Sequence, residues 1–250
     1  MRARLQAALL TRPPRLLHAL LPGCEWTGPP ATPAGAPAVY LTFDDGPVPE
    51  ETPWVLEQLA AFGAQGTFFC VGDNLARHPD IARAALAAGH RLGNHTQHHR
   101  SAWATGRAGY RREVAACQAV LGGLLATGGQ HPEVRGAFHP ATAGEKPGLG
   151  NQQPAVSNEK PLFRPPYGRL TWPLLAALRP QFRVAMWSVL TRDYDPDLRP
   201  ETCLRLTLAA VRPGDVLVFH DSRKASARLR YVLPRVLAHL AERGYQFLAL

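Results

Sequence analysis

Two adjacent carboxylates are the first strong chemical signal in this sequence. Asp44 and Asp45 directly follow an apolar run and precede the turn pair Gly46-Pro47. Neighbouring carboxylates repel each other, so a cation or a proton must accompany them if both stay at the end of a strand. The alternative is an Asp-rich turn without chemistry, because Asp-Gly is a common turn pair.

A histidine cluster at residues 95–99 supplies the second signal. The segment reads His-Thr-Gln-His-His. On a helical turn His95 and His99 would share a face and could bind one metal ion through their imidazole nitrogens, while His98 would point elsewhere. One Asp and two His leave coordination positions open for water and substrate, which is typical of a catalytic metal site. A polar loop rich in histidine is the alternative.

Two further segments place polar groups beside expected strands. One segment reads Arg164-Pro165-Pro166-Tyr167-Gly168. Its two prolines have no backbone N–H, so the N–H of Tyr167 is the first free backbone donor in a stiff turn, where it could donate a hydrogen bond to an oxyanion. Arg164 could pair with an Asp. Residues 216–219 form a continuous apolar strand that delivers His220 at its end, and in a parallel barrel that end is the catalytic face. A Pro-rich turn and a structural histidine are the alternatives.

The elements that must position these residues alternate between strand and helix. The apolar patterns predict strands at 39–43, 67–71, 91–94, 162–163, 182–189, 215–219 and 245–250. They predict helices at 53–62, 80–88, 110–125, 172–178, 201–211 and 231–242. Such alternation favours parallel strands with helices outside, and about seven strands fit a barrel better than a four- or five-stranded sheet.

The predicted organisation has two parts. Residues 1–38 form an N-terminal helix and a Pro-rich connector, and residues 39–250 form the catalytic domain. A Gly-, Pro-, Gln- and Asn-rich stretch at 128–160 predicts a long, mobile surface insertion, whose His131 and His139 are interpreted as solvated.

Composition excludes several classes of protein. The chain has 250 residues, 46% hydrophobic and 19% charged, which indicates a globular domain. Its net charge of +9 comes almost wholly from scattered arginines, so it favours weak attraction to anionic surfaces and argues against nucleic-acid recognition. No apolar run approaches the roughly 18 residues of a membrane span. The four cysteines form no CxxC pair, which excludes a zinc-thiolate module, and Cys70 and Cys117 are predicted to be reduced core residues.

The N-terminus gives no clear export signal. The apolar stretch at 5–10 is short and is followed by Pro13 and Pro14, which favours a cytoplasmic or membrane-surface location over secretion. Residues 14–21 predict a short amphipathic helix whose face comprises Leu16, Leu17, Leu20 and Leu21. That helix either packs on the domain or lies on a membrane surface.

Four motifs in order resemble those of the polysaccharide deacetylase family, also described as the NodB-homology domain and carbohydrate esterase family 4. They read TFDDGP at 42–47, HTQHH at 95–99, RPPYG at 164–168 and VFH at 218–220, and the resemblance spans about residues 39–250. The resemblance implies an α/β fold, a distorted (β/α) barrel with about seven parallel strands. It also implies one divalent metal ion, zinc before cobalt or nickel.

The resemblance implies roles residue by residue. Asp45, His95 and His99 match the family's metal ligands, and Asp44 matches its general base. The remaining matches comprise an arginine that orients the base, a backbone oxyanion donor and a general acid: Arg164, Tyr167 and His220.

One family motif departs from its usual form. The family often has Asp-x-x-Asp-Trp near the sixth strand, whereas here Leu190 replaces the first Asp and Tyr194 replaces the Trp. Asp193 survives and would hold and tune His220. The departure leaves the chemistry intact but puts the substrate contacts in question.

The sequence therefore predicts a hydrolase that deacetylates N-acetylglucosamine-type sugars in peptidoglycan or chitin-like oligomers. A free amine cannot leave as its anion at neutral pH, so a general acid is required. The alternatives are another amide or O-acetyl ester hydrolase on the same barrel, and a non-catalytic carbohydrate-binding barrel. The expected partner is an acetylated carbohydrate and not a nucleic acid, the expected state is a monomer, and the N-terminal helix could make weak anionic-surface contact.

Overall fold

The computed structural model describes residues 11–127 and 159–250. The expected insertion at 128–160, with His131 and His139, therefore lies almost entirely outside the described residues, as do the first ten residues.

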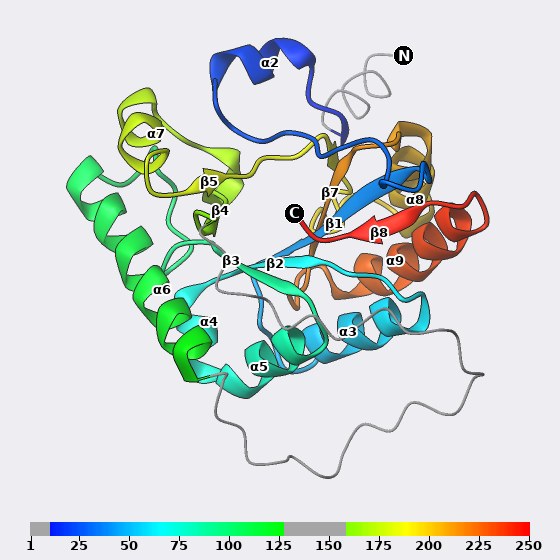
Figure 1. The fold of residues 1–250 in the computed structure, drawn as a ribbon, viewed down its shortest axis with the longest axis horizontal. Helices are drawn as coiled ribbons and strands as arrows, with labels where there is room; N and C mark the ends of the chain where they lie inside the picture. The colour runs from blue at the N-terminus through cyan, green and yellow to red at the C-terminus, as the bar shows by residue number, and fades with distance from the viewer. Residues whose placement is uncertain (1–10, 128–158) are drawn as a thin grey trace.

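The centre of the molecule is a parallel sheet of eight strands within the described part of the chain (Figure 1). The strands run in the order β5-β4-β3-β2-β1-β7-β6, and β8 also pairs with β1. Their bounds are β1 Ala38–Asp44, β2 Thr67–Cys70, β3 Arg91–Asn94, β4 Leu162–Phe163, β5 Arg183–Val184, β6 Val189–Leu190, β7 Val216–His220 and β8 Gln246–Leu248. Along one edge of β1, β8 pairs with its first half and β2 with its second half.

The predicted strand at 182–189 is wrong in one respect, because it forms two strands at opposite edges of the sheet. Ala185 makes an isolated bridge to Glu25, and the N–H of Met186 donates to the carbonyl of Glu25. The N–H of Ser188 then donates to Val216, so the chain crosses from the β5 edge to the β6 edge. The fold prediction of a parallel α/β barrel is confirmed, with eight strands in place of about seven.

Helices cover the outside of the sheet (Figure 1). Their bounds are α3 Thr52–Ala61, α4 Gly72–Arg77, α5 Pro79–Ala87, α6 Arg107–Thr127, α7 Trp172–Leu178, α8 Pro200–Ala210 and α9 Ser226–Ala241, and a 3₁₀ turn η1 covers Pro166–Gly168. The predicted helices agree to within a few residues, except that α9 starts at Ser226 and that α4 was not predicted. The six residues of α4 are too few to show a helical apolar period.

The alternation of side chains along β1 prepares the site. Val39, Leu41 and Phe43 belong to the same hydrophobic cluster as the buried side chains of α9. Tyr40 belongs instead to the cluster inside the barrel, together with Phe69 of β2. Because successive side chains of a strand point to opposite faces, Asp44 continues the interior row and ends it at the carboxyl end of β1.

The three cysteines at 70, 117 and 203 are buried and free, and Cys24, also free, is half-buried. The interpretation of Cys70 and Cys117 as reduced core residues is therefore confirmed. No disulfide forms among the described residues.

The N-terminal segment is tied to the barrel by specific contacts. Arg12 forms an ion pair with Asp215 at 2.7 Å, and Leu21 packs against the cluster that contains the buried face of α7. In the short helix α2 (Arg15–Leu20), Leu16 is 77% exposed and Leu20 52% exposed, so these two residues of the expected leucine face are not packed on the barrel. Within the described residues, no helix combines the length and the apolar character that crossing a membrane would require.

Candidate active site

The carboxyl ends of the strands bring the predicted residues to one end of the barrel. Asp44 lies in register with His220 of β7 and with Phe69 of β2. The loops after β1 and β3 carry Asp45 and residues 95–99, and the loop after β4 begins at Arg164. Ligands and catalytic groups of parallel barrels gather at this end of the strands.

Asp45, His95 and His99 form a cluster with the composition of a metal site. One ligand atom from each lies within 4.8 Å of the other two. The Oδ1 atom of Asp45 lies 3.1 Å from Nε2 of His99 and 3.8 Å from Nε2 of His95. Ligand atoms about 2 Å from a tetrahedral centre are about 3.3 Å apart, so these separations fit one ion.

The loop that carries the histidines is not the helical turn that their spacing suggested. Residues 95–99 have no helical hydrogen bonds, and Thr96 and His99 adopt positive φ angles of 67° and 54°. The side chain of Asn94 shapes the loop, because its Oδ1 accepts a hydrogen bond from the N–H of Thr96 at 2.9 Å. The prediction that His98 points elsewhere is confirmed, since its ring contacts Glu113 on α6.

Protonation and hydrogen bonding prepare this cluster for a cation. Nδ1 of His95 lies 2.8 Å from the carbonyl of Arg164, so it carries the proton and Nε2 keeps a lone pair. Burial lowers the pKa of His95 to about 4, so the ring is neutral at physiological pH. Burial alone would raise the pKa of Asp45, but His99, His220 and His95 lower it below its usual value. Oδ1 of Asp45 is buried without a hydrogen-bond partner among the described residues, which is a position that a cation would satisfy.

Asp44 and Arg164 form a buried ion pair behind this cluster. Arg164 is 0% exposed, and its Nη1 donates to Oδ1 of Asp44 at 2.8 Å and to Oγ1 of Thr42 at 2.7 Å. Its Nε and Nη2 donate to the carbonyls of Ala185 and Met186. All three nitrogens of the guanidinium donate hydrogen bonds, so Arg164 is fixed and in turn fixes Oδ1 of Asp44. The other oxygen, Oδ2, faces Nε2 of His95 at 4.0 Å.

His220 and Asp193 form a second pair on the opposite side of Asp44. Nδ1 of His220 lies 2.7 Å from Oδ1 of Asp193, and the N–H of His220 donates to Oδ2 at 2.8 Å. Burial alone would lower the pKa of His220, but the charge and hydrogen bond of Asp193 outweigh it and raise the pKa to about 9. The ring of Tyr194 packs edge-on against His220 with centroids 4.9 Å apart, so the residue that departs from the family pattern still supplies an aromatic contact.

Tyr167 sits at the bend of η1. Its φ of 61° is left-handed, and its N–H makes no hydrogen bond to another described residue. Its exposed ring lies 4.7 Å from the ring of His99. The N–H that the two prolines were expected to leave free is therefore available beside the cluster.

Sequence reasoning missed a buried brace beneath the two carboxylates. Oδ1 of Asp221 accepts from the N–H of Gly46 at 3.0 Å, and Oδ2 accepts from the hydroxyl of Thr52 at 2.6 Å. Burial raises the pKa of Asp221 to about 8. A Cβ on Gly46 would lie 2.0 Å from Asp221, so only glycine fits there. Asp221 directly follows His220, which is the one signal that could have drawn attention to it; Thr52 carries none.

Glu113 on α6 was also missed, and it holds the histidine loop from the outside. Its Oε2 accepts from the N–H of His98 at 3.0 Å, and both carboxylate oxygens lie 2.9 Å from Nδ1 of the same residue. Its carbonyl accepts from the N–H of Gln97 at 3.0 Å. Glu113 thus fixes the two residues that precede His99.

Glu113→Gln is expected to weaken metal binding about tenfold, because groups that orient metal ligands typically contribute 10- to 100-fold to affinity. Gln keeps one acceptor but loses the charge and one of the two oxygens that face His98. Titration against a competing chelator measures the change. Glu57→Gln, the same substitution at an exposed position of α3, is the matched control. Equal affinity in both variants would show that Glu113 does not position the loop.

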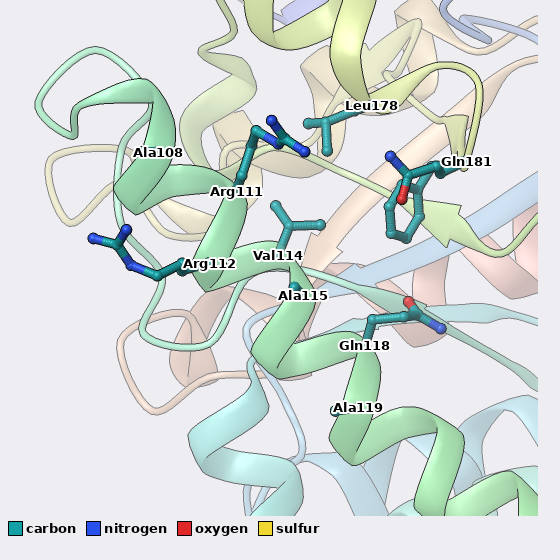
Figure 2. Close-up of a pocket in the computed structure, with 10 residues that line it drawn as sticks. Ala108, Arg111, Arg112, Val114, Ala115, Gln118, Ala119, Leu178 and Gln181 are labelled. Atoms are coloured by element: carbon teal, nitrogen blue, oxygen red, sulfur yellow. The ribbon is translucent and has the colours of Figure 1, made fainter.

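A groove of about 620 Å³ lies apart from this site, between α6 and the end of α7 (Figure 2). Val114, Leu178 and Phe182 line it together with Arg111 and Gln118. None of the clustered carboxylates and histidines reaches it. The groove is therefore separate from the candidate site at the strand ends.

Comparisons with known proteins agree with this arrangement. The family model for polysaccharide deacetylase matches residues 31–140. A chitooligosaccharide deacetylase of Sinorhizobium fredii (strain NBRC 101917 / NGR234) is 32% identical over 231 residues, which cover 86% of this chain and 91% of that protein. A peptidoglycan-N-acetylglucosamine deacetylase of Bacillus cereus is 27% identical over 218 residues, which cover 85% of this chain and 66% of that protein.

The fold is also similar to solved structures. The crystal structure of the Bc1960 peptidoglycan N-acetylglucosamine deacetylase matches with a TM-score of 0.70 and 24% identity, and the match covers 93% of each chain. This likeness supports the arrangement of strands and helices described above.

Proposed function

This chain belongs to the polysaccharide deacetylase family, and from that membership we propose that it hydrolyses the acetamide of N-acetylglucosamine-type sugars in peptidoglycan or chitin-like oligomers. The products are acetate and a free amino sugar. The observation that carries the proposal is the juxtaposition of the Asp45–His95–His99 cluster with the pairs Asp44–Arg164 and His220–Asp193. The family predicted from the four motifs is confirmed by the relatives.

Asp45, His95 and His99 would hold the divalent metal on which the family depends. A carboxylate oxygen and two imidazole nitrogens suit zinc, with cobalt and nickel as further candidates. Such an ion, when bound, polarises a water molecule and the acetamide carbonyl.

Asp44 is the proposed general base. Arg164 holds one carboxylate oxygen at 2.8 Å, so the other can accept the proton of the attacking water. The fully buried guanidinium thereby places its positive charge directly beside the Asp44 carboxylate.

Tyr167 acts on the carbonyl oxygen of the reacting amide, and His220 acts on its nitrogen. The free N–H of Tyr167 donates to the oxygen that becomes negative as water adds to the carbonyl. His220, kept protonated by Asp193, gives its proton to the nitrogen that leaves as the amine. Asp193 is therefore a positioning residue for His220.

Three further proposals concern the rest of the chain. Residues 1–38 and 39–250 are an N-terminal segment and a catalytic domain, and the protein acts as a monomer. The exposed Leu16 and Leu20 of α2, together with the net positive charge, support weak contact with an anionic surface through that helix.

Acetate release from chitooligosaccharides of defined length tests the proposed function. Release is expected from the metal-loaded protein, is expected to stop with a chelator, and is expected to return when zinc, cobalt or nickel is added back. Release that is insensitive to chelator would contradict the metal site. Activity on O-acetyl esters alone would favour the esterase alternative, and binding of the oligomer without release would favour a non-catalytic barrel.

A further inference from the structure

A row of planar side chains leads outward from the Asp45–His95–His99 cluster. It starts at His99, whose ring lies 4.7 Å from the ring of Tyr167. The guanidinium of Arg169 lies 5.5 Å from the centre of the Tyr167 ring and 4.9 Å from that of Trp103. The row is therefore continuous from a ligand of the reaction centre to the loop before α6.

Three members of this row, Tyr167, Arg169 and Trp103, are exposed to solvent. Trp103 is 67% exposed and Tyr167 60% exposed, which is unusual for such large rings. Arg169 is also exposed and has no carboxylate partner among the described residues. Nε1 of Trp103 faces the carbonyl of Leu170 at 3.5 Å, which ties the indole to the segment that carries Arg169.

The chemistry of the row points to a sugar ring that bears a carboxylate. Exposed aromatic faces supply flat apolar area at low entropic cost, which matches the C–H face of a pyranose. A guanidinium that lies over aromatic rings keeps its N–H edge free to form the two parallel hydrogen bonds that a carboxylate accepts. An uncharged sugar would leave that edge unused.

We propose that Tyr167, Arg169 and Trp103 form a subsite for the sugar next to the reacting one, and that Arg169 pairs with a carboxylate on that sugar. The inference rests on the proposed function and extends it to substrate choice. It assigns to the chain a preference for acidic glycans over neutral chitin-like oligomers. An example of an acidic glycan is a peptide-free glycan strand of peptidoglycan, in which the lactyl ether of every second sugar ends in a carboxylate.

The test compares three soluble oligomers of equal length: a neutral chitooligosaccharide, a peptidoglycan glycan strand, and the same strand with its carboxylates converted to methyl amides. The parent protein is expected to show a higher kcat/KM for acetate release from the acidic strand than from its amidated form. In Arg169→Gln the ratio of these two values is expected to fall about tenfold or more, mostly through KM, because a hydrogen bond between charged groups is worth about that factor.

Two further variants and one control separate the parts of the proposal. Arg169→Lys keeps the charge but not the planar fork, so its ratio is expected to lie between those of the parent and of Arg169→Gln. Trp103→Ala is expected to raise KM for all three oligomers. Arg205→Gln removes the same charge at an exposed position of α8 and is expected to keep the parent ratio.

A parent protein without preference for the acidic strand, or an unchanged ratio in Arg169→Gln, would overturn the subsite. In either case acetate is still released, so the deacetylase assignment stands. Absence of release from every oligomer by the metal-loaded parent would instead overturn the proposed function itself.

Discussion

Asp44→Asn is expected to lower kcat for acetate release by about 100- to 10,000-fold, which is the usual contribution of a positioned base. Asn has nearly the same shape but its amide cannot accept the proton of water. The proposed metal ligands are Asp45, His95 and His99, and Asp44 is not one of them. Metal affinity is therefore expected to stay close to that of the parent. Rates at saturating substrate and a chelator-competition titration measure the two quantities.

The same substitution leaves Arg164 buried without its carboxylate. Breaking a buried ion pair from one side typically costs about 3–5 kcal/mol, so the unfolding free energy is expected to fall as well. Rates are therefore measured at a temperature where denaturant titration shows the variant to be folded. Asp197→Asn, at an exposed position, is the matched control for the chemical change. A folded, metal-bound Asp44→Asn protein with a near-parent rate would show that Asp44 has only a structural role.

Asp193→Asn is expected to lower kcat by about 100-fold or more and to change the pH profile on its alkaline side. His220 must be protonated to act as the acid, and its pKa is raised to about 9 in the presence of Asp193. Without that charge, burial dominates and the pKa falls. The protonated fraction is then lost at lower pH, so the alkaline limb of the profile is expected to move to lower pH.

Initial rates between pH 5 and 10, at a metal concentration that keeps the protein loaded, give the profile of parent and variant. Because the titrations of neighbouring groups are coupled, the shift between the two proteins is more informative than either limb alone. An alkaline limb at the same pH in Asp193→Asn would show that Asp193 does not serve His220. The replacement of the family's first Asp by Leu190 would then indicate a rebuilt acid site.

Local patterns were enough to predict most of the barrel. Strand β1 and helix α7 lie where their apolar runs placed them, because buried parallel strands and amphipathic helices leave strong periodic signals. The prediction of a single strand at 182–189 was wrong because the residues between β5 and β6 are mostly apolar too, so the pattern does not show where one strand ends and the next begins. Which edge Val184 and Val189 join depends on bonds to Glu25 and Val216, and no local pattern records those.

The structure brings together the residues that the motifs single out. Asp44, Asp45, His95 and His220 stood out because polar residues follow directly on apolar strands. The brace made by Asp221 did not stand out, because it joins segments far apart in the chain: Asp221 meets Gly46 across 175 positions of sequence. The positive φ of Thr96, one of two left-handed residues in the histidine loop, could not be predicted either, since threonine carries no signal for positive φ.

The position of β1 has a consequence for how the protein is made. This strand carries Asp44, yet one of its edges is completed by β7 and part of the other by β8, both far later in the sequence. Pairings of such high sequence separation form slowly, because a long loop must close before they contribute. During synthesis the edge of β1 that faces β7 therefore stays unpaired until residues 216–220 have emerged, although β2 can pair with the other edge much earlier. The half of the site that needs His220 comes together only after β7 has been synthesised.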